Sequence, residues 1–557
     1  MKEKNLKNRN LIDILIIVFA ALLIGIPLLS SKIDIYLDDG IQHIARALGT
    51  TESFKENFLF PNIISSFTNG YGYSWNLFYG PITTYAIIAV RFIVRNYIVA
   101  YKIFTVIAMF LSGLFMYNFL KNFTRNNEVA LLGSVLYMTF PYHLTDLYTR
   151  NAIGEYTSFA FIPLVFWGLY NLFNTLDKNY YLSLGAIGLI LTHNISTVIV
   201  SIFSFIYLLI NIERLKDSKV RKYLLINVMF ILLVSSFYWG PLLETKMATD
   251  YQVYENGMMS TSEKTASHGL NFTQLFVTPS DGSAYVFELG PHILIMLAFS
   301  VMTITSLKPE LKKTYVFFLV CGLISLWMAT KYFPWKYLPE QFSIIQFPWR
   351  MMMTAAFFLS VVCAMNMGTV IKKFSLKDVL ILSIISLLYI LAFYNILVRY
   401  CDSNLTNIEN IDMGNVSGRE YETVAGIAKA EYLPTKAYKN RFYVATREKN
   451  IYVLEGKAII ENELKDGAKY VADLKTGDAE YTIFELPYIY YPGYEVRLDG
   501  MITDSFETEN GFLGIIMGKE DAAKLEVDYV GTKVMKITMF ISIISFIGMS
   551  IYIFKKR

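Results

Sequence analysis

The stretch LIDILIIVFAALLIGIPLLSSKIDIYLDDGIQHIARA, residues 11–47, decides the fold, because an apolar run is followed directly by a dense polar motif. Residues 11–29 are long and apolar enough for one membrane span, which needs roughly 20 residues. No small-x-small cleavage site follows, so we expect an uncleaved first span. If a helix begins at Asp39, His43 at i+4 and Arg46 at i+7 lie on the same face. The motif is either a solvated loop helix capped by Asp38 or a working surface at the membrane edge.

The composition indicates a polytopic membrane protein. Of the 557 residues, 54% are hydrophobic and only 17% are charged, a balance that soluble domains do not show. The net charge of +4 is small for this length, so nucleic acid is not implied as a partner. The three cysteines form no CxxC or evenly spaced set, which supports neither a disulfide framework nor a zinc site.

Apolar segments predict about 12 spans, and basic residues predict their direction. With the N-terminus in the cytoplasm, all six basic clusters fall on the cytoplasmic side, around positions 2–9, 121–125, 214–222, 308–313, 372–377 and 555–557. Residues 81–95 are apolar but contain Arg91 and end at Arg95, so we expect an interfacial or re-entrant helix there. Otherwise the polar motifs would fall on opposite faces of the membrane.

The character of the chain changes after residue 397. The stretches FYVAT, NIYVLEG, EYTIFELPYIYY, YEVRLDG, GFLGIIM and KLEVDYV alternate polar and apolar residues, with Gly and Asp between them. This pattern predicts a small antiparallel β domain, most simply a sandwich. We therefore expect a transmembrane domain at 1–397, an extracytoplasmic, mainly β domain at 398–532, and a C-terminal membrane anchor at 533–557. The β domain either braces the membrane domain or binds glycan.

Four polar motifs face the predicted outer side, and their candidate residues are Asp38, Asp39, His43 and Arg46; Asp146, Arg150 and Glu155; His193 and Asn194; and Gln346 and Arg350. Each has an ordinary explanation, such as an interfacial anchor, a hydrogen-bonded packing histidine or an i,i+4 ion pair. Ionisable groups at membrane depth nevertheless tend to face a protein cavity. Arginine suits phosphate oxygens, and a carboxylate suits deprotonation of a hydroxyl.

Other classes of enzyme and carrier leave signals that this chain lacks. Walker, GxGxxG, HExxH and GxSxG motifs are not present in the sequence. A secondary transporter would show two related halves with broken helices, and only the break at His193 resembles one.

A series of motifs resembles a known family. In order they are GYGYSWNLFYGPITTY (70–85), PYHLTDLYTRNAIGEY (141–156), THNIST (192–197), IIQFPWRMM (344–352) and EYLPT (431–435). This order resembles bacterial membrane proteins named 6-pyruvoyl-tetrahydropterin synthase-related. The stretch LPYIYYPGYEVRLDG (486–500) is similar to the membrane-proximal end of bacterial GT-C-type glycosyltransferases implicated in decorating lipid-linked envelope polymers. The soluble synthase uses a zinc-binding histidine trio, and the five histidines here form no such cluster.

The resemblance to GT-C enzymes implies an α-helical polytopic fold and an inverting transfer of sugar from a polyprenyl-phosphate donor to a cell-envelope glycan or glycopolymer. It implies Asp39 as the catalytic base with Asp38 as the close second, and Arg150 or Arg350 as the phosphate holder, with Arg46 a weaker candidate. His43, Asp146, Glu155, His193, Asn194 and Gln346 would line the substrate site.

The resemblance leaves the cation and the class of protein open. Some relatives use Mg or Mn, which Asp38, Asp39 and Glu155 could bind through oxygen atoms. The implied location is the bacterial cytoplasmic membrane with the active face outside. The alternative is a non-catalytic transporter, flippase-like or scaffolding protein for lipid-linked glycans.

Overall fold

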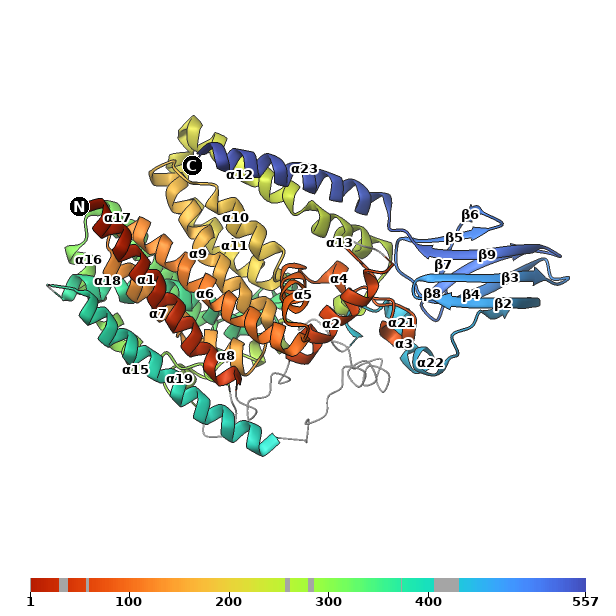
Figure 1. Cartoon of the computed structure of the whole chain (residues 1–557), viewed down its shortest axis with the longest axis horizontal. Coiled ribbons are helices and arrows are strands. Elements are labelled where there is room, and N and C mark those ends of the chain that lie inside the picture. Colours follow the sequence, from red (N-terminus) through yellow and green to blue (C-terminus); the bar gives the residue numbers. More distant parts are fainter. Residues whose placement is uncertain are drawn as a thin grey trace.

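The computed structural model describes residues 2–29, 39–56, 60–255, 261–278, 285–371, 373–404 and 430–556. Most of the chain is helical, and two β sheets lie at one end (Figure 1). In the described ranges, seven helices are long and apolar enough to cross a membrane: α1 (Lys2–Gly25), α6 (Tyr97–Thr124), α9 (Ile153–Asn174), α17 (Pro309–Met328), α18 (Met352–Val370), α19 (Leu376–Asn404) and α23 (Lys533–Lys556). This confirms the predicted class, a polytopic helical protein with a small β domain before the last apolar helix.

Several of the roughly twelve predicted spans are shorter or broken helices. α12 (Ser218–Val234) and α13 (Ser236–Ala248) together make one candidate span with a 62° bend. The remaining helices in the membrane domain are α5 (Ile82–Val94), α7 (Asn127–Met138), α10 (Tyr181–Ile190), α11 (Asn194–Ile210), α15 (Pro291–Ala298) and α16 (Ser300–Ser306). α5 has 13 residues, about 20 Å at 1.5 Å per residue. That is shorter than a hydrocarbon core of roughly 30 Å, so the non-spanning assignment of residues 81–95 stays our prediction.

Shorter elements connect these helices. They are α2 (Gly40–Ser53), α3 (Phe67–Gly70), α4 (Trp75–Phe78), α8 (Pro141–Tyr148), α14 (Ser262–Ser267) and seven 3-10 turns: η1 (Ile26–Leu29), η2 (Ile212–Lys216), η3 (Gln252–Tyr254), η4 (Phe272–Leu275), η5 (Trp335–Tyr337), η6 (Glu340–Ile345) and η7 (Pro348–Met351). Local sequence explains several boundaries. The side chain of Asn96 accepts from the Val99 N–H at 2.9 Å, and that of Asn126 accepts from the Val129 N–H at 3.0 Å. These are N-caps, which fix where α6 and α7 begin.

α9 and α18 form the centre of the helical part, because both are buried along nearly their whole length. α6, α7, α10 and α17 pack around them. α19 and α23 lie at the periphery and expose apolar side chains such as Leu391, Phe540 and Ile547. A helix that exposes such residues along its length is suited to a lipid environment.

The β domain is a sandwich of two antiparallel sheets. One has the order β1-β4-β8-β7 and the other β2-β3-β9-β5-β6. The strands are β1 (Tyr452–Glu455), β2 (Ala458–Asp466), β3 (Lys469–Thr476), β4 (Tyr481–Ile489), β5 (Tyr494–Leu498), β6 (Met501–Thr503), β7 (Phe506–Glu507), β8 (Phe512–Gly518) and β9 (Ala522–Tyr529). Phe484 and Leu513 from one sheet meet Leu474 and Leu525 from the other in a shared core, as the alternating pattern predicts.

One detail of the predicted β region is wrong. FYVAT is not a strand but part of α22 (Arg441–Thr446), which follows α21 (Thr435–Lys439). The helix places Tyr443 and Arg447, four residues apart, against the same carboxylate of Glu485. α19 continues to Asn404, past the expected end of the transmembrane domain at residue 397, and the division into domains stays a prediction.

Buried contacts join the sandwich to the membrane domain. The Ile489 N–H donates to the Tyr71 carbonyl at 3.0 Å, and the Tyr71 hydroxyl donates to the Arg447 carbonyl at 2.7 Å. Arg447 Nη1 lies 3.2 Å from Glu485 Oε1, and both side chains are fully buried. The sandwich is therefore held by polar contacts in a water-excluded interface, where they are strong.

The basic clusters gather at the opposite end of the molecule. Arg9 Nη2 lies 3.2 Å from Glu128 Oε1, and Lys556 Nζ donates to the Tyr223 hydroxyl at 2.9 Å. α1 begins and α23 ends at this end, far from the sheets (Figure 1). The arrangement agrees with a shared side for the positive charges.

Candidate active site

Two buried arginines share one carboxylate at the start of α9. Glu155 Oε2 lies 2.9 Å from Arg150 Nη1 and 3.2 Å from Arg350 Nε. Arg150 lies in the turn before α9, and Arg350 lies in η7, nearly 200 residues later in the chain. Two of the predicted polar motifs therefore meet in one place.

Tyr142 and Asp146 complete this cluster from α8. The Tyr142 hydroxyl donates to Glu155 Oε1 at 2.6 Å and accepts from Arg150 Nη1 at 2.9 Å, while Asp146 Oδ1 lies 2.5 Å from the same Nη1. Burial, together with the negative charge of Glu155, raises the pKa of Asp146 well above its usual range despite Arg150. The second oxygen of Asp146 is buried and has no hydrogen-bond partner among the described residues. Both observations favour the neutral form of the Asp146 carboxyl.

Asp39 lies beside this cluster. Its N–H donates to the Arg150 carbonyl at 3.1 Å. Burial lowers the pKa of Arg150, but the negative charges around it, Asp39 among them, raise it above the usual range on balance. Asp39 is exposed at the N-terminal end of α2, and its side chain makes no capping hydrogen bond. Asp38 lies outside the described residues.

The interpretation of this motif as a solvated loop helix is wrong. α2 begins at Gly40 and buries both His43 and Arg46, which are 5% and 0% exposed. Arg46 does not reach the cluster. Its guanidinium donates to Asn76 Oδ1 at 2.9 Å and to the carbonyls of Tyr79 and Gly80 at 2.7 and 3.2 Å. It fixes the turn before α5, so we do not assign it the predicted contact with substrate.

Tyr79 lies between two buried histidines. Its ring centroid is 5.5 Å from that of His43 and 6.0 Å from that of His193. Burial lowers the pKa of each histidine to about 3, so both are neutral at pH 7. His193 also caps α11, because its Nδ1 accepts from the Ser196 N–H at 3.3 Å. The predicted break in the helix at His193 is therefore present, and His193 stabilises it as the N-cap of α11.

Asn194 and Gln346 each hold a neighbouring part of the site in place through hydrogen bonds. Asn194 Nδ2 donates to the Phe78 carbonyl at 3.1 Å, and its Oδ1 accepts from the Tyr238 hydroxyl at 3.0 Å. Gln346 Oε1 accepts from Arg350 Nη1 at 2.9 Å. Gln346 has a φ of 62°, a conformation that a non-glycine residue adopts only under constraint. Asn194 thus fixes the turn that carries Tyr79, and Gln346 orients Arg350.

Tyr79 and Tyr142 were not among the predicted site residues. For Tyr142 a signal was present, since Tyr142, Asp146 and Arg150 are spaced by four residues and so share one side of a helix. Tyr79 lies in an aromatic-rich stretch with no spacing that separates it from its neighbours.

The carboxylates of the cluster do not fit a divalent cation. Both oxygens of Glu155 are already hydrogen-bonded, one to Tyr142 and the other to two guanidinium groups. Within the described ranges, no three His, Cys, Asp or Glu residues form a possible metal site. Glu155 is thus paired with positive side chains. The proposed reaction therefore uses no cation at the predicted position of Asp38, Asp39 and Glu155.

Comparisons with known proteins give the following. A family model described as "6-pyruvoyl-tetrahydropterin synthase related domain; membrane protein" matches residues 77–400. An uncharacterized protein of Lactococcus lactis subsp. cremoris is 24% identical over 607 aligned residues, which cover 99% of this chain and 96% of that protein. Among solved structures, the mycobacterial arabinofuranosyltransferase AftD is similar over 69% of this chain, with a TM-score of 0.44 and 11% identity. The match covers 27% of AftD, so the chain spans about a quarter of its length.

Proposed function

Given that the chain belongs to the family of membrane proteins described as 6-pyruvoyl-tetrahydropterin synthase related, we propose that it is a membrane glycosyltransferase. It transfers a sugar from a polyprenyl-phosphate donor to an acceptor of the cell envelope, on the outer side of the cytoplasmic membrane. The family name does not describe this site, since the described residues contain no histidine trio of the synthase kind.

The observation that carries the proposal is the pair of arginines around Glu155. Among the described residues, all side-chain hydrogen bonds of Arg150 use Nη1, and those of Arg350 use Nε and Nη1. Each therefore keeps its Nη2 for a ligand. The guanidinium groups of Arg150 and Arg350 attract an anion. Two guanidinium groups held by one carboxylate suit the oxygens of a lipid phosphate.

Asp39 supplies the base in this proposal. The acceptor hydroxyl attacks the anomeric carbon of the donor sugar, and its proton passes to the Asp39 carboxylate. The new bond from oxygen to carbon forms as the bond from that carbon to the phosphate oxygen breaks. The lipid phosphate leaves with the electron pair and is held by Arg150 and Arg350. The anomeric configuration is inverted, because one displacement occurs.

The proposal rests on three short connections. Asp39 is hydrogen-bonded to the backbone of Arg150, and Arg150 is bonded to Glu155, which in turn binds Arg350. A base must lie within hydrogen-bond reach of the proton it takes, directly or through one water. In this proposal the acceptor hydroxyl binds between Asp39 and a phosphate held by the two arginines.

The test measures transfer of label from a panel of synthetic polyprenyl-phosphate sugars to envelope material, using membranes that contain the full-length protein. We expect Asp39→Asn to remove transfer while its level in the membrane is unchanged. Glu52→Gln is the matched control, because Glu52 is an exposed acid on the same helix. Full transfer by Asp39→Asn would refute Asp39 as the base, and no transfer by the unaltered protein would refute the enzymatic proposal. Movement of lipid-linked glycan across vesicles by both variants would then favour the carrier alternative.

A further inference from the structure

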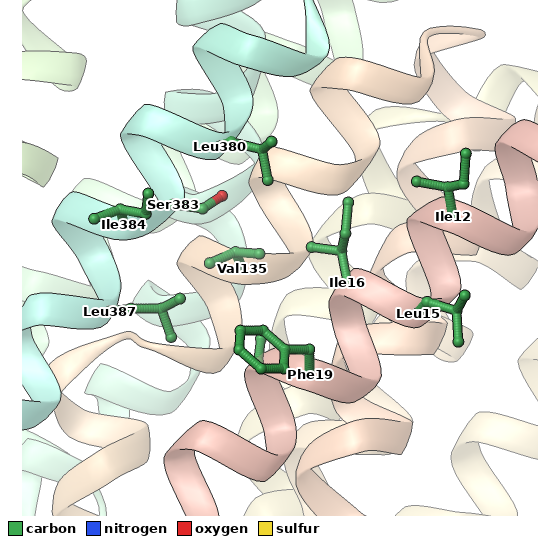
Figure 2. Close-up of a pocket in the computed structure, with 10 residues that line it drawn as sticks. Ile12, Leu15, Ile16, Phe19, Val135, Leu380, Ser383, Ile384 and Leu387 are labelled. Carbon is green, nitrogen blue, oxygen red and sulfur yellow. The ribbon is translucent and has the colours of Figure 1, made fainter.

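A groove runs between α1 and α19 on the lipid-exposed side of the helical part, with α7 as its floor. Figure 2 shows its walls, with Ile16 and Phe19 on α1 facing Leu380 and Leu387 on α19. Its volume is about 360 Å³. Ile12, Leu15 and Ile384 at its rim are largely exposed. In a bilayer this groove opens sideways to lipid.

One polar atom interrupts the apolar lining. Ser383 on α19 is 4% exposed, and its hydroxyl has no hydrogen-bond partner among the described residues. A buried serine in a helix commonly donates to the carbonyl four residues earlier, as Ser386 does to Leu382 at 3.2 Å. The oxygen of Ser383 instead points into the groove (Figure 2). A donor without an acceptor is costly in an apolar medium, so the hydroxyl indicates a ligand that brings an oxygen.

The depth of Ser383 indicates what kind of ligand this is. Lys377, six residues earlier on α19, is exposed, as is Lys373 just before the helix. Six residues of helix span about 9 Å. An anionic headgroup near these lysines would therefore have its ester carbonyls close to Ser383 and its chain along Phe19 and Leu387. The nearby Asp378 is already engaged, because it accepts from the N–H and hydroxyl of Ser375 at 2.9 and 2.6 Å.

We propose that the groove binds one acyl chain of an anionic diacyl phospholipid, with an ester carbonyl accepting a hydrogen bond from Ser383. The site lies at the lysine-bearing end of α19, away from the arginine cluster, and does not depend on the proposed transfer reaction.

The groove favours this ligand over two others. A polyprenyl chain has no acceptor oxygen along its length for Ser383. A helix of a second copy would offer no free backbone carbonyl to Ser383, because its carbonyls are hydrogen-bonded within the helix.

The experiment uses the full-length protein in nanodiscs with phosphatidylglycerol that carries a photoreactive group on one acyl chain. We expect cross-links on α1 and α19 near Phe19 and Leu387. Ser383→Ala should lower the cross-linked fraction about two- to tenfold, the range that one hydrogen bond supports. Ser386→Ala is the matched control, and we expect no change from it. Ala20→Phe, which fills part of the groove from its α1 wall, should reduce cross-linking at least as strongly.

Replacing Lys373 and Lys377 by glutamine should remove the preference for phosphatidylglycerol over phosphatidylcholine. Cross-links spread evenly over α19 and α23 would mean surrounding lipid only and would overturn the proposal. Equal yields from Ser383→Ala and Ser386→Ala would overturn it as well. Displacement of the probe by polyprenyl phosphate, or cross-links between two copies through Leu15→Cys, would assign the groove to another occupant.

Discussion

Replacing Glu155 with glutamine is the sharpest perturbation of the arginine cluster. The change keeps the shape of the side chain and removes the negative charge that Arg150 and Arg350 share. These arginines are 6% and 7% exposed, so water cannot readily take over the role of the carboxylate. Breaking a buried ion pair by removing one partner destabilises a protein by about 3–5 kcal/mol. The amide oxygen of glutamine still accepts one hydrogen bond, so we expect a destabilisation at the lower end of this range, about 3 kcal/mol.

Asp146→Asn is the matched control for this change, since both acids contact the same Nη1 of Arg150. Burial raises the pKa of Asp146 well above its usual range, so we expect a neutral carboxyl that asparagine replaces without a change of charge. We expect the free energy of unfolding to fall by less than about 1 kcal/mol, the net contribution of one hydrogen bond.

The assay is unfolding of the purified protein by increasing mole fractions of SDS at pH 7, followed by tryptophan fluorescence. If Asp146→Asn lowers the free energy of unfolding as much as Glu155→Gln does, the assignment of a neutral Asp146 and a charged Glu155 is refuted. The same assay gives the sign of the pH effect. The unfolded chain loses the Asp146 proton above its usual pKa while the folded chain keeps it, so this group makes folding less favourable as pH rises. Asp146→Asn should remove that part of the pH dependence.

Three further predictions concern neighbouring features. His43 and His193 have pKa values lowered to about 3 from 6.5, so the free energy of unfolding should fall by up to about 1.4 kcal/mol per pH unit for each between pH 6 and 4. His193→Gln should reduce this slope in SDS titrations, and an unchanged slope would contradict the assignment. Arg46→Lys should destabilise by about 1–3 kcal/mol because buried acceptors lose their donor, which the same titration at pH 7 checks. In a background with Cys401→Ser, Met247→Cys should react with an impermeant maleimide on intact cells and Lys219→Cys only after permeabilisation; the reverse pattern would overturn the proposed orientation.

Long apolar segments were enough to predict the helical membrane class, and alternating polar and apolar residues were enough to predict the two-sheet β domain. They failed for FYVAT, because a five-residue stretch with two aromatic residues fits a strand as well as a helix. The contact of Tyr443 and Arg447 with a distant carboxylate selects the helix. β2 and β3 were missed because their outward positions carry many charges, such as Glu461 and Lys475, which hide the apolar alternation.

Sequence also predicted that separate polar motifs meet, and the contacts among Asp39, Arg150, Glu155 and Arg350 agree with that expectation. It ranked Arg46 below Arg150 and Arg350 as a phosphate holder but still placed it in the substrate site, since all three arginines lie in outer polar motifs. What distinguishes Arg46 is a turn 30 residues away that offers two carbonyls and an amide. Protonation states such as that of Asp146 depend on burial, which no spacing reveals.

The buried contacts of Tyr71 with Ile489 and Arg447 limit how this protein can be divided. A soluble fragment that begins after residue 430 would leave Arg447 without the ring of Tyr71 that covers it in the intact chain, and would expose an aromatic surface prone to self-association. Production of the sandwich alone as a lectin-like reagent should therefore give aggregates. Recombination between relatives should preserve function only when the stretch around Tyr71 and the sandwich come from the same parent.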